Sequence, residues 1–118
     1  MGDLEPLLLA HKVDVAFWGH FHYAQRSCPM YNATCITQKD ASGFDAPIHA
    51  LIGNAGQGLS TFPSPRAAWS EYQAKEWGFS HVTVHNETHL TLDYYADAPL
   101  EERAPLHHSH SIVRNYPR

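Results

Sequence analysis

The sequence lacks long apolar runs and a large excess of charge of either sign, and each absence excludes a class of protein. No apolar stretch approaches the roughly 20 residues that a membrane-spanning helix needs, and the longest one, residues 13–18, is interrupted by Asp14. The formal net charge is -4, so no positive excess is present to bind nucleic acid or an anionic membrane. We expect neither nucleic acid nor a membrane as a partner.

Leader and nucleotide-binding motifs are also missing. Residues 1–6 have no basic start and no long apolar run, so we expect no signal peptide in this sequence. A P-loop, a dinucleotide fingerprint and a Ser-His-Asp nucleophile motif are absent. With 118 residues, 43% of them hydrophobic and 17% charged, the composition predicts one folded domain and not a disordered tail.

Only two cysteines are present, and their spacing indicates a protein located outside the cytosol. The short polar segment between Cys28 and Cys35 favours a small disulfide loop, and zinc held together with the nearby His22 is the alternative. Asn32 and Asn86 each begin a glycosylation sequon. We therefore predict a secreted protein. The missing leader implies that the chain is either processed or incomplete, and we favour a fragment.

Hydrophobic patterns predict mostly strands with one helix at the N-terminus. Leu4, Leu7, Leu8 and His11 follow the spacing of an amphipathic helix, which Asp3 can cap. The remaining expectations are a strand covered on both faces at residues 13–18, a polar surface loop at 37–46, a strand at 48–52, an irregular segment or short helix at 63–75, a hairpin of residues 80–85 and 89–95, and a closing strand at 111–114.

Gly19-His20-Phe21-His22 follows the first predicted strand. In an extended segment, alternate side chains point the same way, so His20 and His22 would share one cavity while Phe21 turns toward the core. That arrangement suits two metal ions with one imidazole on each. Gly19 would let the chain turn sharply there. Spacing alone leaves the alternative of a surface histidine pair open, because the chain has 10 histidines.

The other histidines favour structural interpretations. His107, His108 and His110 are expected to form a flexible exposed cluster. His81, His85 and His89 are expected to lie on an exposed hairpin face, where His81 and His89 can oppose each other. His49 lies in an apolar strand and is expected to be a hydrogen-bonded core residue.

Several segments resemble the purple acid phosphatases, within the calcineurin-like metallophosphoesterases. The Gly-His-x-His signature marks the broad superfamily, and Arg26 with Cys28-Pro29-Met30-Tyr31-Asn32 narrows the resemblance. The similarity extends over roughly residues 3–114, through residues 4–8, 13–22, 46–49, 52–56, 69–70, 79–81 and 111–114.

The resemblance implies an α/β fold in which residues 1–118 are a single incomplete domain, the C-terminal part of a metallophosphoesterase β-sandwich flanked by helices. It implies hydrolysis of phosphate monoesters at acidic pH by a binuclear centre, with His20 on a divalent Zn, Mn or Fe(II) ion and His22 on Fe(III). It also implies a secreted, extracellular or vacuolar protein.

The sequence departs from the family pattern in two ways. Ala24 and Gln25 stand where the family has Tyr-Glu, which bears on substrate range. The family's upstream aspartates, tyrosine, Asn-His segment and histidines are not in this sequence, so no catalytic residue beyond the two ligands is expected, and the chain alone is expected to be inactive. The alternatives are a non-catalytic secreted glycoprotein module, or a phosphodiesterase or nucleotide pyrophosphatase of the same superfamily.

Overall fold

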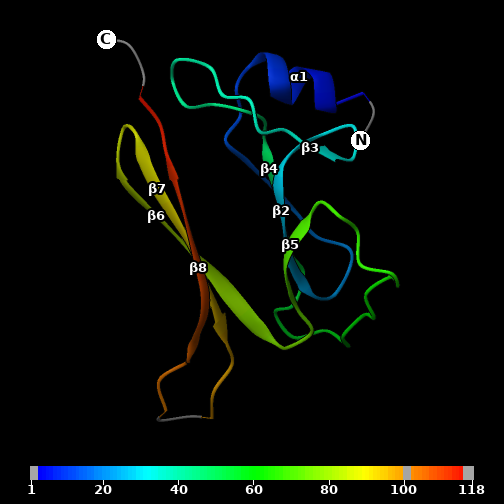
Figure 1. Cartoon of the computed structure of the whole chain (residues 1–118). Coiled ribbons are helices and arrows are strands. Elements are labelled where there is room, and N and C mark those ends of the chain that lie inside the picture. Colours follow the sequence, from blue (N-terminus) through cyan, green and yellow to red (C-terminus); the bar gives the residue numbers. More distant parts are fainter. Residues whose placement is uncertain (1–2, 100–101, 116–118) are drawn as a thin grey trace.

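The computed structural model describes residues 3–99 and 102–115, and these consist mainly of strands (Figure 1). Residues 1–2, part of the stretch in which we expect no signal peptide, lie outside the described ranges. Within those ranges no helix has the length and apolar composition needed to cross a bilayer. The described elements are α1 (Glu5–Ala10), β1 (Val15–Trp18), β2 (Ala24–Tyr31), β3 (Thr34–Cys35), β4 (Ile48–Ile52), β5 (Ser70–Ala74), β6 (Gly78–Asn86), β7 (His89–Ala96) and β8 (Leu106–Val113).

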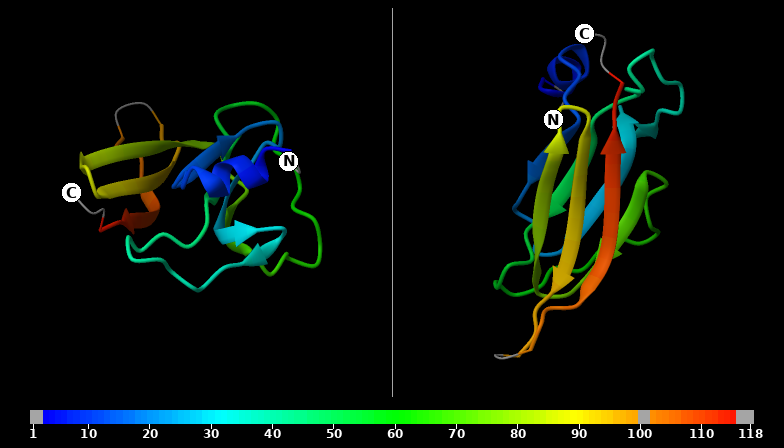
Figure 2. Two further views of the ribbon diagram at one scale, coloured as in Figure 1. Left: turned by 90° about the horizontal axis from the view of Figure 1, so that it is seen from above. Right: turned by 90° about the vertical axis from the view of Figure 1, so that its left-hand side faces the viewer.

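The strands form two sheets that pack against each other as layers (Figures 1 and 2). In the first sheet, β1 pairs with β4 in parallel, β4 pairs with β2 in antiparallel, and both β5 and the short β3 pair with β2. The second sheet is an antiparallel meander of β6, β7 and β8. The predicted fold, mostly strands in a sandwich with one N-terminal helix, is confirmed.

The apolar core lies between the two sheets. Leu92 and Tyr94 on β7 are buried, while Thr91 and Asp93 beside them are only half-buried, so β7 alternates as its sequence predicts. Their partners in the core are Ala24 at the start of β2 and the partly buried Val15, Ile52, Tyr72 and Ala74. The predicted hairpin therefore supplies the face on which the first sheet packs.

A buried arginine joins the two sheets. Arg26 on β2 is 4% exposed, and its Nη1 donates to Oε2 of Glu71 on β5 at 3.0 Å. Its Nη2 lies 3.1 Å from Nε2 of His108 on β8. A guanidinium group can only donate, so Nε2 of His108 accepts, and His108 is neutral with its proton on Nδ1. The His108 ring also stacks on Tyr72, with the ring centroids 4.3 Å apart.

The prediction of a flexible histidine cluster near the C-terminus is wrong. His107, His108 and His110 lie within β8, which begins at Leu106 and not at residue 111. His108 and His110 pair with Tyr94 and Leu92 on β7, so their side chains share the face that packs on the first sheet. Pairing with a distant strand outweighs the weak strand preference of this polar run.

Other local predictions also differ from the structure. The helix begins at Glu5 with Leu4 at its N-cap and no side-chain cap, so Asp3 does not cap it. The first strand is not covered on both faces, because Phe17 is 42% exposed. Residues 63–75 contain β5, which pairs with β2. Strand β2 was not predicted because its buried residues include Gln25 and Arg26, which hide the apolar pattern of a central strand.

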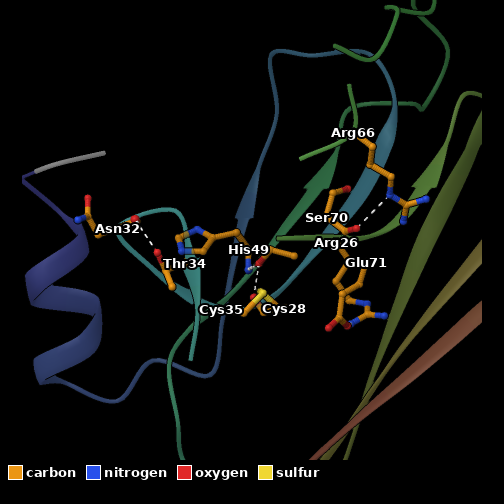
Figure 3. Close-up of a disulfide and its surroundings, with 10 residues drawn as sticks. Arg26, Cys28, Asn32, Thr34, Cys35, His49, Arg66, Ser70 and Glu71 are labelled. Atoms are coloured by element: carbon orange, nitrogen blue, oxygen red, sulfur yellow. Dashed lines mark hydrogen bonds and ion pairs between the residues drawn. A yellow bond between two sulfur atoms is a disulfide. The ribbon is translucent and has the colours of Figure 1, made fainter. Parts of the chain in front are cut away.

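Cys28 and Cys35 form the predicted disulfide (Figure 3). The bond closes the hairpin of β2 and β3, whose turn residues Asn32 and Ala33 both have positive φ angles. Because each sulfur is bonded to the other, the alternative in which both cysteines hold zinc with His22 is excluded.

We expect the contact between Arg26 and His108 to weaken in acid. Burial, followed by the charge of Arg26, lowers the pKa of His108 below 6.5, and burial and Arg26 likewise lower the pKa of His110. Because the folded-state pKa of His108 lies below its unfolded value, the contribution of the Arg26–His108 contact to stability is present at neutral pH. It declines as the pH falls from about 6.5 toward the lowered pKa.

Urea unfolding between about pH 5 and pH 7.5 checks this expectation. The substitution His108→Gln keeps an acceptor for Arg26 that does not titrate, so the free energy of unfolding should fall less steeply in acid than in the wild type. His85→Gln on the exposed hairpin tip is the control and should keep the wild-type slope. Equal slopes for His108→Gln and the wild type would contradict the assignment.

Candidate metal site

The segment that carries His20 and His22 follows β1, where the two parallel strands β1 and β4 end. Trp18 of β1 is opposite Leu51 of β4, so the bend after β1 (residues 19–23) and the loop after β4 (residues 53–62) leave the sheet at the same edge. In α/β sheets, ligands gather at the carboxyl ends of the strands. The pairing of β1 with β4 therefore brings the histidine segment and the glycine-rich loop together.

His20 does not have the extended conformation that we predicted. Its φ is +79°, and the Phe21 N–H donates to the Gly19 carbonyl at 3.1 Å, so these three residues form a γ-turn centred on His20. Residues 20–23 form a continuous bend, and the alternation of a strand does not set the directions of the two imidazoles. Positive φ at a residue other than glycine is strained, and such strain concentrates at functional sites.

The prediction that Phe21 turns toward the core is wrong. Its ring is 50% exposed, and Tyr23 is the buried aromatic residue of the bend. Tyr23 stacks with Phe21 at 5.8 Å and with Phe62 of the following loop at 3.9 Å, between ring centroids. The His20 ring meets the edge of Phe21 at 5.0 Å. Aromatic contacts therefore join the bend to the loop.

Gly53, and not Gly19, is the glycine that this geometry requires. A Cβ atom on Gly53 would lie 2.1 Å from the carbonyl oxygen of Phe21, whereas a Cβ atom on Gly19 would meet nothing within 4 Å. Only a residue without a side chain lets the two backbones approach this closely. The backbone just after β4 thus packs directly against the backbone of the bend.

His22 is held by the loop at three of its atoms. Its ring Nδ1 lies 2.7 Å from the carbonyl oxygen of Gly58. Its backbone N–H donates to Ser60 Oγ at 3.0 Å, and its carbonyl accepts from the Ser60 N–H at 3.0 Å. Because a carbonyl oxygen only accepts, Nδ1 carries the proton, and in the neutral ring Nε2 keeps its lone pair. Sequence reasoning found neither of these partners.

Two imidazoles are the donors that this site offers. Among residues 3–99 and 102–115, no three or more His, Cys, Asp or Glu side chains gather closely enough to hold a metal ion. A metal centre of four to six ligands per ion would need donors from outside the described part of the chain. The neutral tautomer of His22, with Nε2 available, is chemically suited to metal binding.

The remaining histidines have other surroundings. His49 is buried, and its Nδ1 accepts from Trp18 Nε1 at 2.9 Å, which confirms that it is a hydrogen-bonded core residue. Burial lowers its pKa. On the hairpin, His81 pairs with Asp93, so the suggested contact between His81 and His89 is wrong. The His89 ring instead lies 4.7 Å from that of His85, between centroids.

The two positions that depart from the expected motif are both buried. Ala24 is 2% exposed and belongs to the core between the sheets. Gln25 is 7% exposed, and its Oε1 accepts hydrogen bonds from Ser70 and Gln73. The two differences from the family motif therefore lie in the packing of β2 against its neighbours.

Comparisons with known proteins place the chain among purple acid phosphatases. Residues 46–102 match the family model described as iron/zinc purple acid phosphatase-like protein C. The chain is 32% identical to the Arabidopsis thaliana protein named "Probable inactive purple acid phosphatase 27", over 97% of this chain and 18% of that protein. It is 28% identical to a Hordeum vulgare nucleotide pyrophosphatase/phosphodiesterase, over 97% of this chain and 31% of that protein.

A solved structure gives the same result for the fold. The purple acid phosphatase from yellow lupin (Lupinus luteus) seeds superposes with a TM-score of 0.85 and 28% identity, over 97% of this chain and 20% of that one. The chain therefore spans less than a third of the length of each of these three proteins.

The contact between Gly53 and Phe21 leads to a stability prediction. Gly53→Ala should lower the free energy of unfolding by about 1–3 kcal/mol, because the bend must move away from β4 to admit a methyl group. Gly19→Ala, whose Cβ meets nothing within 4 Å, is the matched control and should leave stability close to the wild type. Urea unfolding of both variants makes the comparison, and a wild-type value for Gly53→Ala would show that the approach is not required.

Proposed function

The chain belongs to the purple acid phosphatase family, as a C-terminal portion of it, and we propose that His20 and His22 are ligands of a binuclear metal centre that hydrolyses phosphate monoesters. The observation that carries the proposal is the hydrogen bond from His22 Nδ1 to the Gly58 carbonyl, at 2.7 Å. Metal-ligating histidines almost always donate their other ring N–H to a carbonyl, a carboxylate or water, which fixes tautomer and ring orientation. His22 is oriented in this way, with Nε2 available.

Each histidine has a role in this proposal. Following the family pattern, we assign His20 to a divalent Zn, Mn or Fe(II) ion and His22 to Fe(III). When bound, the two ions supply Lewis acidity toward water and the phosphoryl group. Both imidazoles bind as neutral donors, so they leave the positive charge of the site intact for an anionic substrate. The γ-turn orients His20, and the bonds to Gly58 and Ser60 orient His22.

The proposal requires further ligands, because two imidazoles do not complete two coordination spheres. We propose that these come from the part of the catalytic domain that the longer relatives contain and that this sequence lacks. Residues 1–118 are then an incomplete domain. On its own, the chain should not hydrolyse phosphate esters.

Two observations favour other candidate functions. The word "inactive" in the name of the Arabidopsis relative favours a non-catalytic secreted glycoprotein module. The name of the barley relative favours a phosphodiesterase or nucleotide pyrophosphatase. Both candidates share the fold with the proposed phosphatase. The non-catalytic module would differ from it in metal content, and the phosphodiesterase would differ in the preferred ester. Measurements of metal content and of ester preference therefore separate all three.

Substitution of each proposed ligand in the complete gene product tests the assignment. His20→Ala and His22→Ala should each lose one of the two metal ions, measured by mass spectrometry of bound iron, zinc and manganese. Both variants should also lose hydrolysis of p-nitrophenyl phosphate at acidic pH. His85→Ala, which removes an exposed imidazole on the hairpin, should keep wild-type metal content and activity.

The outcomes separate the candidates. Full metal content in His22→Ala would refute the assignment of that residue. A metal-free wild-type protein would favour the non-catalytic module. Faster hydrolysis of bis(p-nitrophenyl) phosphate than of the monoester would favour the phosphodiesterase.

We also propose that the protein is secreted and carries glycans on Asn32 and Asn86. Both side chains are exposed, Asn32 at the turn of the hairpin that the disulfide closes (Figure 3) and Asn86 at the end of β6. The Asn86 side-chain oxygen accepts from the N–H and the hydroxyl of Thr88, both at 2.9 Å. After expression through a eukaryotic secretory pathway, glycopeptide mapping should find both sites modified and the exposed Asn115, which begins no sequon, unmodified. Unmodified Asn32 and Asn86 would contradict this.

A further inference from the structure

We propose that the loop of residues 54–61 is a positioning clamp for His22, and that the turn of residues 75–78 between β5 and β6 holds this clamp in place. The inference rests on the proposed metal role of His22 and extends it to two positioning residues, Ser60 and Trp77. Neither residue is proposed to touch the metal or the substrate.

The clamp acts on His22 from one side. Ser60 bonds both backbone polar groups of His22, and Gly58, two residues earlier, bonds the ring. The two backbone bonds fix the position of the His22 Cα atom, and the ring bond fixes rotation about the side-chain torsions. A ligand held in this way loses little further conformational freedom when a metal binds.

The clamp is itself fastened by the turn between β5 and β6. Asn54 is 4% exposed, its Nδ2 donates to the Glu76 carbonyl at 2.9 Å, and its own carbonyl accepts from the Gly78 N–H at 2.9 Å. Trp77 Nε1 donates to the Gln57 carbonyl at 2.8 Å. Each of these bonds joins the turn to the loop.

A fourth bond ties the far end of the loop. Lys75 Nζ donates to Thr61 Oγ1 at 3.1 Å, so the turn contacts the loop at its first residue, its middle and its last residue. A surface loop with two glycines, Gly56 and Gly58, has a large conformational entropy when free. Fastening it along its length keeps the Gly58 carbonyl and the Ser60 hydroxyl in position.

The turn is anchored in the C-terminal meander. A Cβ atom on Gly78 would lie 2.0 Å from the Tyr95 carbonyl oxygen, so β6 and β7 approach closely here. The Asp97 N–H also donates to the Trp77 carbonyl at 2.9 Å. The contacts form one connected path from the meander through Trp77 and the loop to His22. We therefore infer that a sheet without proposed ligands contributes to metal affinity.

The experiment uses the complete gene product and measures its affinity for Zn²⁺ by competition with a chelator. Ser60→Ala removes the hydroxyl that binds the His22 N–H, and Ser60→Thr restores a hydroxyl. Trp77→Phe removes the indole N–H and keeps an aromatic ring. Loss of an outer partner of a metal-ligating histidine typically costs about 10- to 100-fold in metal affinity. We expect a loss near the lower end of this range for Ser60→Ala, because its hydroxyl binds the His22 backbone. Trp77→Phe should cause a smaller loss, because Trp77 acts through Gln57.

Controls distinguish positioning from a general loss of stability. Ser109→Ala on β8 removes a hydroxyl that donates to Asp93 Oδ1 on β7 at 2.7 Å, and it should leave metal affinity unchanged. Ser60→Thr should recover most of the wild-type affinity. If Ser60→Ala fails to fold, Trp77→Phe still decides the matter, because the Trp77 side chain is half-exposed.

His22→Ala is measured in parallel. If it loses metal while Ser60→Ala and Trp77→Phe bind as tightly as the wild type, the clamp inference is wrong and the ligand assignment stands. If His22→Ala itself binds metal like the wild type, the proposed function is wrong.

Discussion

The contact of the Phe21 backbone with Gly53 depends on the parallel pairing of β1 with β4, and the candidate site depends on both. Parallel pairing places two strand ends at one edge of the sheet, so that the bend with His20 and His22 meets the loop after β4. The absence of a side chain on Gly53 then allows the two backbones to touch. Once they touch, Ser60 and Gly58 are within hydrogen-bonding distance of His22. A looser approach would leave the histidines on an unconstrained surface bend.

The same strands carry a second constraint, which is the burial of polar groups between the sheets. A buried guanidinium is costly unless its charge and hydrogen bonds are satisfied. Arg26 meets this requirement at its two terminal nitrogens, with one acceptor from each sheet, Glu71 on β5 and His108 on β8, while its buried Nε has no hydrogen-bond partner in the described part of the chain. The two sheets are therefore joined by directional bonds as well as by the apolar contacts of Leu92 and Tyr94. These contacts of Arg26 help to set the position of the β6–β7–β8 meander, to which the turn that holds the loop of residues 54–61 is attached.

Sequence patterns predicted the elements whose signal is local. The alternation at residues 80–85 and 89–95 was sufficient for the hairpin, and the apolar run at 48–52 for β4, because burial on one face or two leaves a direct pattern. Strands β2 and β5 and most of β8 were not predicted. Gln25, Arg26 and His108 are polar residues whose partners lie on other strands, so no local pattern marks them as part of a sheet.

By itself, the sequence determined the family, the position of the Gly-His-x-His segment at a strand end and the cysteine pair, since each depends on residues close together in the chain. The tertiary structure alone decided how the two histidines are held. The partner of the His22 ring is 36 residues away, and that of Arg26 on β8 is 82 residues away. The γ-turn at His20 and the role of Gly53 likewise follow from packing against β4. Sequence motifs identify which side chains are available for chemistry, but contacts between distant segments determine their orientation and protonation.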